Sequence, residues 1–185
     1  MSSLKNQIII SMPHMQDPYF GRAVVFICEH NKDGALGFIV NKPFETPELQ
    51  DLFSDFFPED DDILKLVPDV YFGGPILVER GIVLHSADYK TEGTIVIGDN
   101  FSLTSNKAIV QEIAEKKGPK HSKLLLGHAG WAQYQLEAEI ENGDWLLQHT
   151  NLEFIFNTEE KFMWDMATKS FGIDMSEFSG LGGSA

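Results

Sequence analysis

Residues 23–40, with the sequence AVVFICEHNKDGALGFIV, decide the fold. The run Ala23–Cys28 is wholly apolar and rich in Val and Ile, which predicts a strand buried on both faces. Turn residues follow at 31–34, and the pair Asp33-Gly34 is a strong signal for a hairpin turn. Leu36–Val40 is a second apolar run. The stretch therefore predicts a β-hairpin over residues 23–40.

Short apolar segments recur outside this hairpin and predict further strands. They are Ile8–Ser11, Val70–Phe72, Ile82–His85, Thr94–Ile97, Lys123–Leu126, Trp145–Gln148 and Glu153–Phe156. Helical segments are fewer, and strands and helices do not alternate strictly. The sequence therefore predicts an α+β fold with a mixed, mostly antiparallel sheet.

Four segments predict helices. Pro47 suits a first helical position with Thr46 as its cap, and this helix runs to about Phe56. A second helix is capped by Thr104 or Ser105 and ends at Gly118-Pro119. The other two span residues 133–141 and 158–172. The side chains expected to be buried are Ile109, Val110, Ile113 and Ala114 in the second helix, Leu136 and Ile140 in the third, and Phe162, Met163, Met166 and Ala167 in the fourth.

The composition predicts one domain over residues 1–185, because 43% apolar residues suffice for a core without disulfides or metals. The Gly- and Ser-rich tail 178–185 is expected to be mobile. Cys28 is the single cysteine, so no intrachain disulfide can form, which fits a reducing compartment. The sequence has no signal-peptide pattern and no apolar stretch of roughly 20 residues, so we expect a cytoplasmic protein without membrane contact.

The net charge of −14 argues against direct contact with nucleic acid. Such affinity comes from Lys and Arg side chains that neutralise phosphates, and this chain has 14 of them against 28 carboxylates. The densest basic cluster, Lys116, Lys117, Lys120 and Lys123, flanks Gly118-Pro119 and is interpreted as the solvated end of a helix. A nucleic-acid patch at these lysines is the less favoured alternative.

A series of motifs follows in a defined order along the chain. The first half contains SMPHM (11–15), DPYF (17–20), CEHN (28–31) and GALGFIVNKP (34–43). The second half contains YFGGP (71–75), VLHS (83–86), GHAGW (127–131) and QLE (135–137). In this order the motifs resemble the AlgH/YqgE family of bacterial proteins, over about residues 8–172.

The resemblance implies a sheet bent towards a pseudo-barrel and a role labelled transcriptional regulator. It implies no catalytic residues, and the sequence indicates no cofactor. Together with the charge, it leads us to expect an indirect effect on transcription, through an unidentified protein partner or a small anionic ligand. The sequence departs from the family pattern at His128, where Tyr is expected, and at Ala132-Gln133-Tyr134, where a small Gly-containing stretch is expected. The oligomeric state is left open.

Two glycine-rich segments are candidates for a ligand pocket. Gly73-Gly74-Pro75 follows an apolar strand, and its N–H groups could bind an oxyanion, although a tight turn is the favoured interpretation. Gly127-His128-Ala129-Gly130-Trp131 lies between a predicted strand and a predicted helix, where a helix N-terminus could hold an anion. A compact connection around a buried Trp131 is an equal alternative.

Asn41 and His85 complete the candidate pocket, although Asn41 is also expected to hydrogen-bond the backbone at a strand end. Cys28 is expected on the strand face that carries His30. No pair of histidine or cysteine residues has a metal-ligand spacing, so we predict structural histidines and no metal site. Cys28 ends an apolar run and is expected to be an unreactive thiol.

Three functions fit these features. The favoured hypothesis is a non-catalytic regulatory or ligand-binding protein, with both glycine-rich segments and His85 in one concavity. An enzyme acting through His85 or His128 would need a histidine with a shifted pKa in a cleft. A protein-interaction adaptor would expose an apolar patch of more than a few hundred Å², for which residues 171–181 are a candidate.

Overall fold

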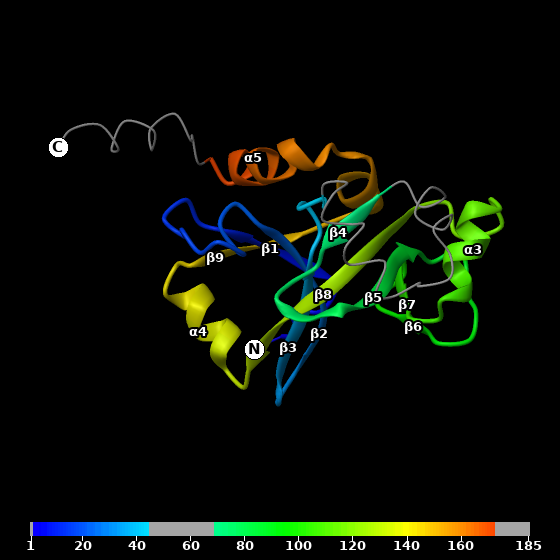
Figure 1. The fold of residues 1–185 in the computed structure, drawn as a ribbon. Helices are drawn as coiled ribbons and strands as arrows, with labels where there is room; N and C mark the ends of the chain where they lie inside the picture. Colours follow the sequence, from blue (N-terminus) through cyan, green and yellow to red (C-terminus); the bar gives the residue numbers. More distant parts are fainter. Residues whose placement is uncertain (1, 45–68, 173–185) are drawn as a thin grey trace.

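One curled sheet connects the described parts of the chain (Figure 1). The computed structural model describes residues 2–44 and 69–172. Within these ranges nine strands pair in the order β6-β7-β5-β8-β3-β2-β1-β9, and β4 pairs with β8. Every strand pairing within these ranges is antiparallel except that of β4 with β8. The fold is therefore α+β with a mostly antiparallel sheet, as predicted.

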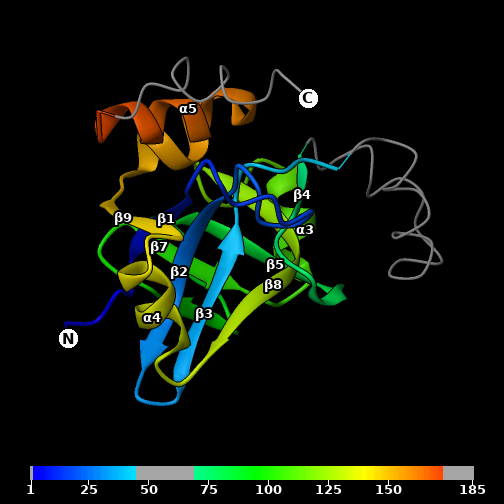
Figure 2. The same ribbon diagram turned by 90° about the vertical axis from the view of Figure 1, so that its left-hand side faces the viewer.

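The strands are β1 (Gln7–Ser11), β2 (Val24–Asn31), β3 (Gly34–Ile39), β4 (Val70–Phe72), β5 (Ile76–Ser86), β6 (Thr94–Val96), β7 (Phe101–Thr104), β8 (Ser122–Ala132) and β9 (Trp145–His149). The helices of the described ranges are α3 (Ala108–Ala114), α4 (Gln135–Glu141), the π-helix η1 (Glu153–Asn157) and α5 (Glu160–Ser170). The long strands β5 and β8 lie side by side, and the sheet curls around them into a half-barrel (Figure 1, Figure 2).

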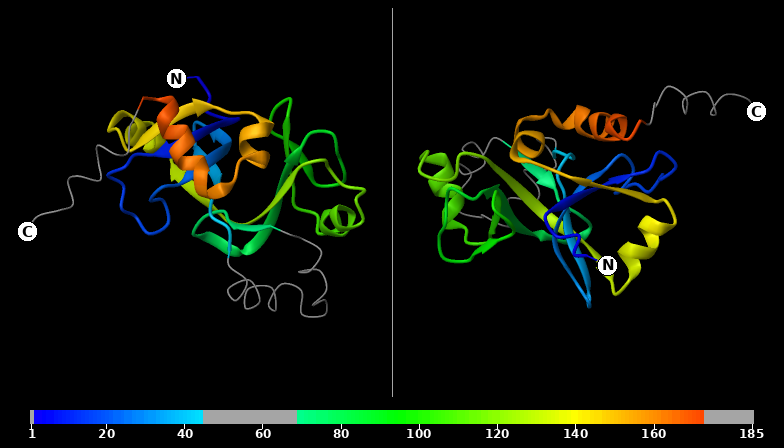
Figure 3. Two further views of the ribbon diagram at one scale, coloured as in Figure 1. Left: turned by 90° about the horizontal axis from the view of Figure 1, so that it is seen from above. Right: turned by 180° about the vertical axis from the view of Figure 1, so that it is seen from behind.

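The α-helices α3, α4 and α5 each cover a different apolar face of this sheet. α5 lies over one end of the half-barrel, where Met163 and Trp164 join the largest core cluster. α4 packs through Leu136 onto a second cluster, and α3 packs through Ile109 and Val110 onto a third. The three helices lie apart from one another around the sheet (Figure 3). Since a fully buried aliphatic side chain contributes roughly 1.5–3 kcal/mol, each helix is stabilised mainly by its own face of the sheet.

The predicted hairpin is confirmed as β2 and β3. Its register shifts between Ile27 and Glu29, so Cys28 is the extra residue of a β-bulge. The bulge reverses the alternation of side chains. His30 therefore turns towards α4, where its Nε2 lies 2.7 Å from Glu137 Oε1, whereas Cys28 faces the cluster beneath α5. The expectation that Cys28 and His30 share a face is wrong for this reason.

The segment Gly127–Trp131 belongs to β8 and is not a loop. β8 runs on to Ala132 and pairs there with β3. α4 starts only at Gln135, after Tyr134 in a left-handed conformation with φ of 62°. The predicted strand-to-helix connection is therefore wrong. Glycines inside a strand resemble a loop in the sequence, but here they permit close approach of another backbone.

Three further predictions are corrected by the structure. Glu153–Phe156 lies in the π-helix η1 and not in a strand. α3 starts at Ala108, because Thr104 belongs to the unpredicted strand β7. In α5, Phe162 and Met166 are exposed, because the buried stripe is centred one residue further on, at Met163, Trp164, Ala167 and Thr168. 

The predicted helix over residues 46–56 and the predicted mobile tail 178–185 lie outside the described residues. In the part of the chain that is described, no helix has the length and apolar character needed to cross a bilayer.

One carboxylate joins α4 to two strands. Glu139 Oε2 accepts hydrogen bonds from the indole N–H of Trp131 in β8 at 2.9 Å and from that of Trp145 in β9 at 2.8 Å. Gln135, one turn earlier on the helix, donates to Glu139 Oε1 at 2.9 Å. Both tryptophans are buried, so each indole depends on Glu139 as its acceptor.

Replacing Glu139 with Ala is expected to lower the free energy of unfolding by roughly 2–4 kcal/mol, because two buried N–H groups lose their acceptor. Denaturant titration measures this loss. Glu141→Ala, at an exposed position on the same helix, is the matched control and is expected to change stability by less than about 0.5 kcal/mol. Equal stabilities of the two variants would contradict the role of Glu139.

Candidate functional site

The two predicted glycine-rich segments lie against each other through their backbones. A Cβ on Gly73 would sit 2.3 Å from the Gly127 carbonyl oxygen, and one on Gly74 would sit 2.2 Å from the His128 carbonyl carbon. A Cβ on Gly127 would sit 2.2 Å from the Gly74 carbonyl oxygen. We call Gly73, Gly74 and Gly127 the glycine seam. No side chain fits there without backbone movement, which explains the glycines in steric terms.

The backbone of the seam is also engaged in the sheet. The Gly73 N–H donates to the Leu126 carbonyl at 2.7 Å, and the Gly73 carbonyl accepts from the Ile39 N–H at 2.8 Å. The Gly73 N–H is therefore not available to an anion. The favoured interpretation of a structural turn fits this geometry better than an oxyanion site.

A long bulge in β5 lies opposite the seam. The register jumps from Ile76 opposite His128 to Gly81 opposite Leu126, so four residues, 77–80, face Gly127 alone. Leu77 takes a positive φ of 49°, a conformation that is strained for a branched side chain. Bulges of this kind re-aim side chains and are common beside binding sites.

The bulge borders a groove on the concave side of the half-barrel, with a volume of about 330 Å³. We call it the concave groove. Its walls come mainly from β2, β3, β5, β6, β7 and β8, and six of its lining side chains are aliphatic. The lining residues are Cys28, Glu29, Leu36, Phe38, Leu77, Arg80, Gly81, Ile82, Ile95, Ile97, Leu103, Ser105, Gly127 and His128.

Two charged side chains line the concave groove. Glu29 already accepts a hydrogen bond from the Asn31 amide at 2.9 Å. Arg80 is exposed and forms no ion pair with any other described residue. The groove thus combines apolar side chains, one carboxylate that accepts a hydrogen bond from Asn31, and one cation that forms no ion pair within residues 2–44 and 69–172.

The other polar groups of the groove are neutral at pH 7. Burial, and next the positive charge of Arg80, lower the pKa of His128, so its imidazole is uncharged. Burial raises the pKa of the Cys28 thiol to about 12, and the thiol donates to the Leu36 carbonyl at 3.3 Å. Cys28 is therefore poorly suited to act as a thiolate nucleophile.

The remaining residues of the predicted pocket do not line the concave groove. Asn41 ties two backbone segments together, since its Oδ1 accepts from the Val24 N–H at 2.8 Å and its amide donates to the Arg22 carbonyl at 2.9 Å. Ala129 and Trp131 are buried, whereas Pro75 and Gly130 are exposed, and none of these four lines the concave groove. Of the predicted residues, Gly127 and His128 line it.

His85 has no exposed surface. Its Nδ1 donates to the Ser86 carbonyl at 2.8 Å, which leaves Nε2 to accept from the Thr104 hydroxyl at 2.8 Å. Burial lowers the pKa of His85. A ligand cannot contact this imidazole unless Thr104 or its neighbours move, so the structure separates His85 from the concave groove.

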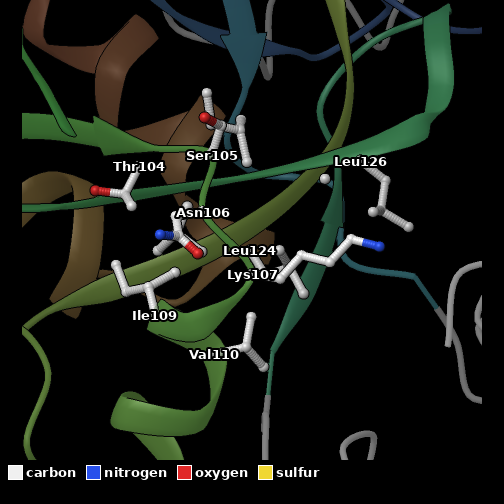
Figure 4. A pocket seen from close by; sticks show the side chains of 11 residues that line it. Thr104, Ser105, Asn106, Lys107, Ile109, Val110, Leu124 and Leu126 are labelled. Atoms are coloured by element: carbon white, nitrogen blue, oxygen red, sulfur yellow. The ribbon is translucent and has the colours of Figure 1, made fainter. Parts of the chain in front are cut away.

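A second, smaller cavity of about 60 Å³ lies beneath α3 (Figure 4). Ile109 and Val110 of α3 border it on one side, and Leu124 and Leu126 of β8 border it on the other (Figure 4). We call it the α3 cavity. Its other lining residues are Gly81, Ile82, Val83, Thr104, Ser105, Asn106 and Lys107.

Sequence reasoning missed a buried charge at Lys123, which was interpreted as part of a solvated lysine cluster. Its side chain is 3% exposed, its Nζ donates to the Val40 carbonyl at 2.9 Å, and it lies 3.5 Å from Glu160 Oε1. The Nζ also lies 4.4 Å from the centre of the Tyr71 ring, and the Tyr71 hydroxyl donates to Glu160 at 2.5 Å. The signal available in the sequence was the position of Lys123 at the start of the predicted strand 123–126.

This network shifts the pKa of each member. Burial lowers the pKa of Lys123 to about 8, against the opposing effect of Glu160. Burial also raises the pKa of Tyr71. Burial by itself would raise the pKa of Glu160, but the hydrogen bond from Tyr71 and the charge of Lys123 lower this pKa below its usual value. Their contacts join α5 to β4 and β8, and none of these three groups lines the concave groove or the α3 cavity.

The described residues contain no cluster of three or more His, Cys, Asp or Glu side chains that could hold a metal ion. The half-barrel, its glycine seam and the concave groove define a small α+β protein with a ligand-sized concavity. The chain belongs to the AlgH-like family, whose profile matches residues 8–176. The resemblance drawn from the sequence motifs is confirmed.

The relatives match along nearly their whole length. A UPF0301 protein of Jannaschia sp. (strain CCS1) is 40% identical, over 98% of this chain and 95% of the relative. The YqgE protein of Salmonella paratyphi B is 36% identical, over 99% and 100%. The solution structure of AlgH from Pseudomonas aeruginosa is similar with a TM-score of 0.78 at 30% identity, over 100% of this chain and 97% of that one. The crystal structure of DIP2367 from Corynebacterium diphtheriae shares the fold, with a TM-score of 0.71 at 20% identity over 92% and 87%.

Lys123 is expected to make stability depend on pH. Because its pKa falls from the ordinary 10.5 to about 8 on folding, the unfolded chain binds more protons between these values, and stability rises with pH there. The full difference corresponds to roughly 3 kcal/mol. Tyr71, whose pKa is raised by burial, acts in the opposite direction only above its ordinary value of 10.

Denaturant unfolding of the wild type and of Lys123→Met, from about pH 7 to 10, measures this effect. The wild type is expected to gain stability relative to the variant as the pH rises. Parallel pH profiles for the two proteins would show that Lys123 is not a buried cation.

Proposed function

We propose that this protein is a regulatory, ligand-binding protein whose concave groove takes a small amphipathic anion. The apolar part of the ligand lies along the aliphatic wall, and its anionic group pairs with Arg80. The observation that carries the proposal is an arginine without an acidic partner among the described residues, placed at an aliphatic groove.

The size and lining of the groove support a small-molecule ligand. Its volume of about 330 Å³ falls within the range of roughly 300–1,000 Å³ typical of such sites. Leu36, Ile82 and Leu103 provide aliphatic surface, and Phe38 adds one ring. This lining favours an alkyl or branched apolar body over a flat polar one, since few hydrogen-bonding groups face the groove.

The charge distribution supports an anionic head group. The chain has 28 carboxylate side chains and 14 cationic ones, and two of the cationic side chains are arginines. Arg22 is engaged, since it lies 3.3 Å from Asp165 and 4.4 Å over the Trp164 ring. Arg80 has no such partner in the described residues, and a guanidinium binds carboxylate or phosphate through two parallel hydrogen bonds.

The same charge balance supports an indirect regulatory role. A net charge of −14 repels nucleic acid, so an effect on transcription would pass through the bound ligand and a protein partner. We therefore propose that the protein exerts its regulatory effect through the presence or absence of the bound ligand, and not through contact with DNA.

Arg80→Gln is expected to weaken the binding of decanoate, a linear alkyl carboxylate, by about tenfold or more, because a charge-assisted hydrogen bond contributes roughly 1.5–3 kcal/mol. Isothermal titration and ligand-dependent melting temperatures measure the affinity. Arg22→Gln, at the arginine that is already paired, is the matched control and is expected to bind decanoate as the wild type does. Equal binding by Arg80→Gln and the wild type would reject the proposed head-group site.

A second candidate is an enzyme that acts through His128, because this histidine is neutral and lines the groove. Such an enzyme would release p-nitrophenol from acyl esters, and His128→Gln would stop the release while binding of alkyl carboxylates persisted. The ligand-binding proposal expects no release by the wild type above the uncatalysed rate.

The adaptor alternative requires an exposed apolar patch. Phe162 and Met166 on α5 are exposed apolar side chains, whereas residues 173–181 lie outside the described ranges.

A further inference from the structure

The sheet has a break beside the concave groove. The ladder between β5 and β7 ends where Val83 pairs with Thr104. Beyond this point Gly81 and Ile82 pair with β8 alone, and the chain after Thr104 turns from the sheet towards α3. The strands β5 and β7 therefore part at Gly81, Ile82 and Ser105, where no backbone ladder closes the sheet.

Both cavities reach this break from opposite faces of the sheet. Gly81, Ile82 and Ser105 line the concave groove and the α3 cavity alike. The rest of the groove faces the core cluster beneath α5, whereas the rest of the α3 cavity belongs to the cluster under α3. One thin wall thus separates a groove of about 330 Å³ from an apolar cavity of about 60 Å³.

Gly81 is the part of this wall that has no side chain. A Cβ there would lie 3.4 Å from Leu126 Cδ2 and 3.5 Å from Leu124 Cδ1, which is ordinary van der Waals contact. Gly81 also does not take a positive φ. Alanine would therefore fit without strain, and neither sterics nor backbone conformation demands glycine. The consequence of glycine at this position is that the wall beside Leu124 and Leu126 is thinner by about one methyl group.

We infer that the α3 cavity is the tail subsite of the concave groove and receives the end of an alkyl chain whose anionic head lies at Arg80. This inference rests on the proposed function and names its ligand class as linear alkyl carboxylates or alkyl phosphates. The inner wall of the cavity is made of Val83, Ile109, Val110, Leu124 and Leu126, so it suits hydrocarbon and not a second polar group. Its volume of about 60 Å³ has room for roughly two groups the size of a water molecule or a methylene.

A homologous series from hexanoate to tetradecanoate, titrated below the micelle concentration, tests the inference. Affinity for the wild type is expected to rise about fourfold per added methylene until the tail subsite is filled, and then to level off. Dodecyl phosphate and dodecyltrimethylammonium complete the series. The first is expected to bind as the carboxylates do, and the second carries the same tail without an anion and is expected to bind at least about tenfold more weakly.

Gly81→Ala is the decisive variant, because its methyl group points to Leu124 and Leu126 and takes the place of about one methylene. It is expected to bind the short carboxylates as the wild type does and the longest ones about fourfold more weakly. Val110 lines the α3 cavity but not the groove. Val110→Ala is therefore expected to increase the chain length at which the affinity stops rising. Ile97 lines the groove but not the cavity. Ile97→Val is the matched control and is expected to lower the affinity by the same factor at every chain length.

The outcomes separate the two proposals. If the wild type binds the series and Arg80→Gln weakens it, but Gly81→Ala follows the wild type at every length, the tail subsite is refuted and the groove stands. If Gly81→Ala loses the same factor at every length, the tail subsite is refuted as well. If no member of the series binds the wild type, the proposed function fails and the tail subsite fails with it.

A second measurement does not depend on the fold of any variant. The methyl resonances of Val110 in the wild type are expected to shift on addition of the long carboxylates and to stay in place with hexanoate. Shifts that are equal for all chain lengths would overturn the inference.

Discussion

The close backbone contact at Gly73, Gly74 and Gly127 is the constraint on which the rest of the structure depends. It lets β4 lie parallel to β8 in a sheet that is otherwise antiparallel, with main-chain atoms where side chains would normally stand. It also leaves room for the bulge at residues 77–80, which carries Leu77 and Arg80 to the concave side. The glycines therefore shape a site without contacting its ligand through side chains of their own.

The position of the groove follows from where the helices lie. α5 covers one end of the half-barrel, while α4 and α3 cover two other apolar faces of the sheet. No helix of residues 2–44 and 69–172 covers the concave surface between the β2–β3 hairpin and strands β5 to β8, and the aliphatic side chains of this surface line the groove. Arg80 lies at this surface beside Glu29, and within residues 2–44 and 69–172 it forms no ion pair.

Local sequence patterns predicted the elements that depend on neighbours in the chain. The hairpin at 23–40 and the strand Val70–Phe72 were predictable because an apolar run bounded by turn residues can be recognised without knowledge of its partner strand. Gly127 to Trp131 was misjudged because glycine signals a loop, whereas here it signals an approaching backbone from a distant strand. Lys123 and Arg80 escaped prediction for a related reason. Burial of the first depends on Tyr71 and Glu160, and placement of the second depends on a bulge that the sequence alone does not reveal.

The division of the core into three clusters also bears on motion. α3 has seven residues and buries two of them, on a cluster separate from the one beneath α5. Cooperative units of low local stability open without global unfolding, and a short helix on its own small cluster is such a unit. Amide hydrogens of α3 should therefore exchange with solvent well before those of β2 and β8. Local unfolding of α3 would leave the backbone contact at the glycine seam intact.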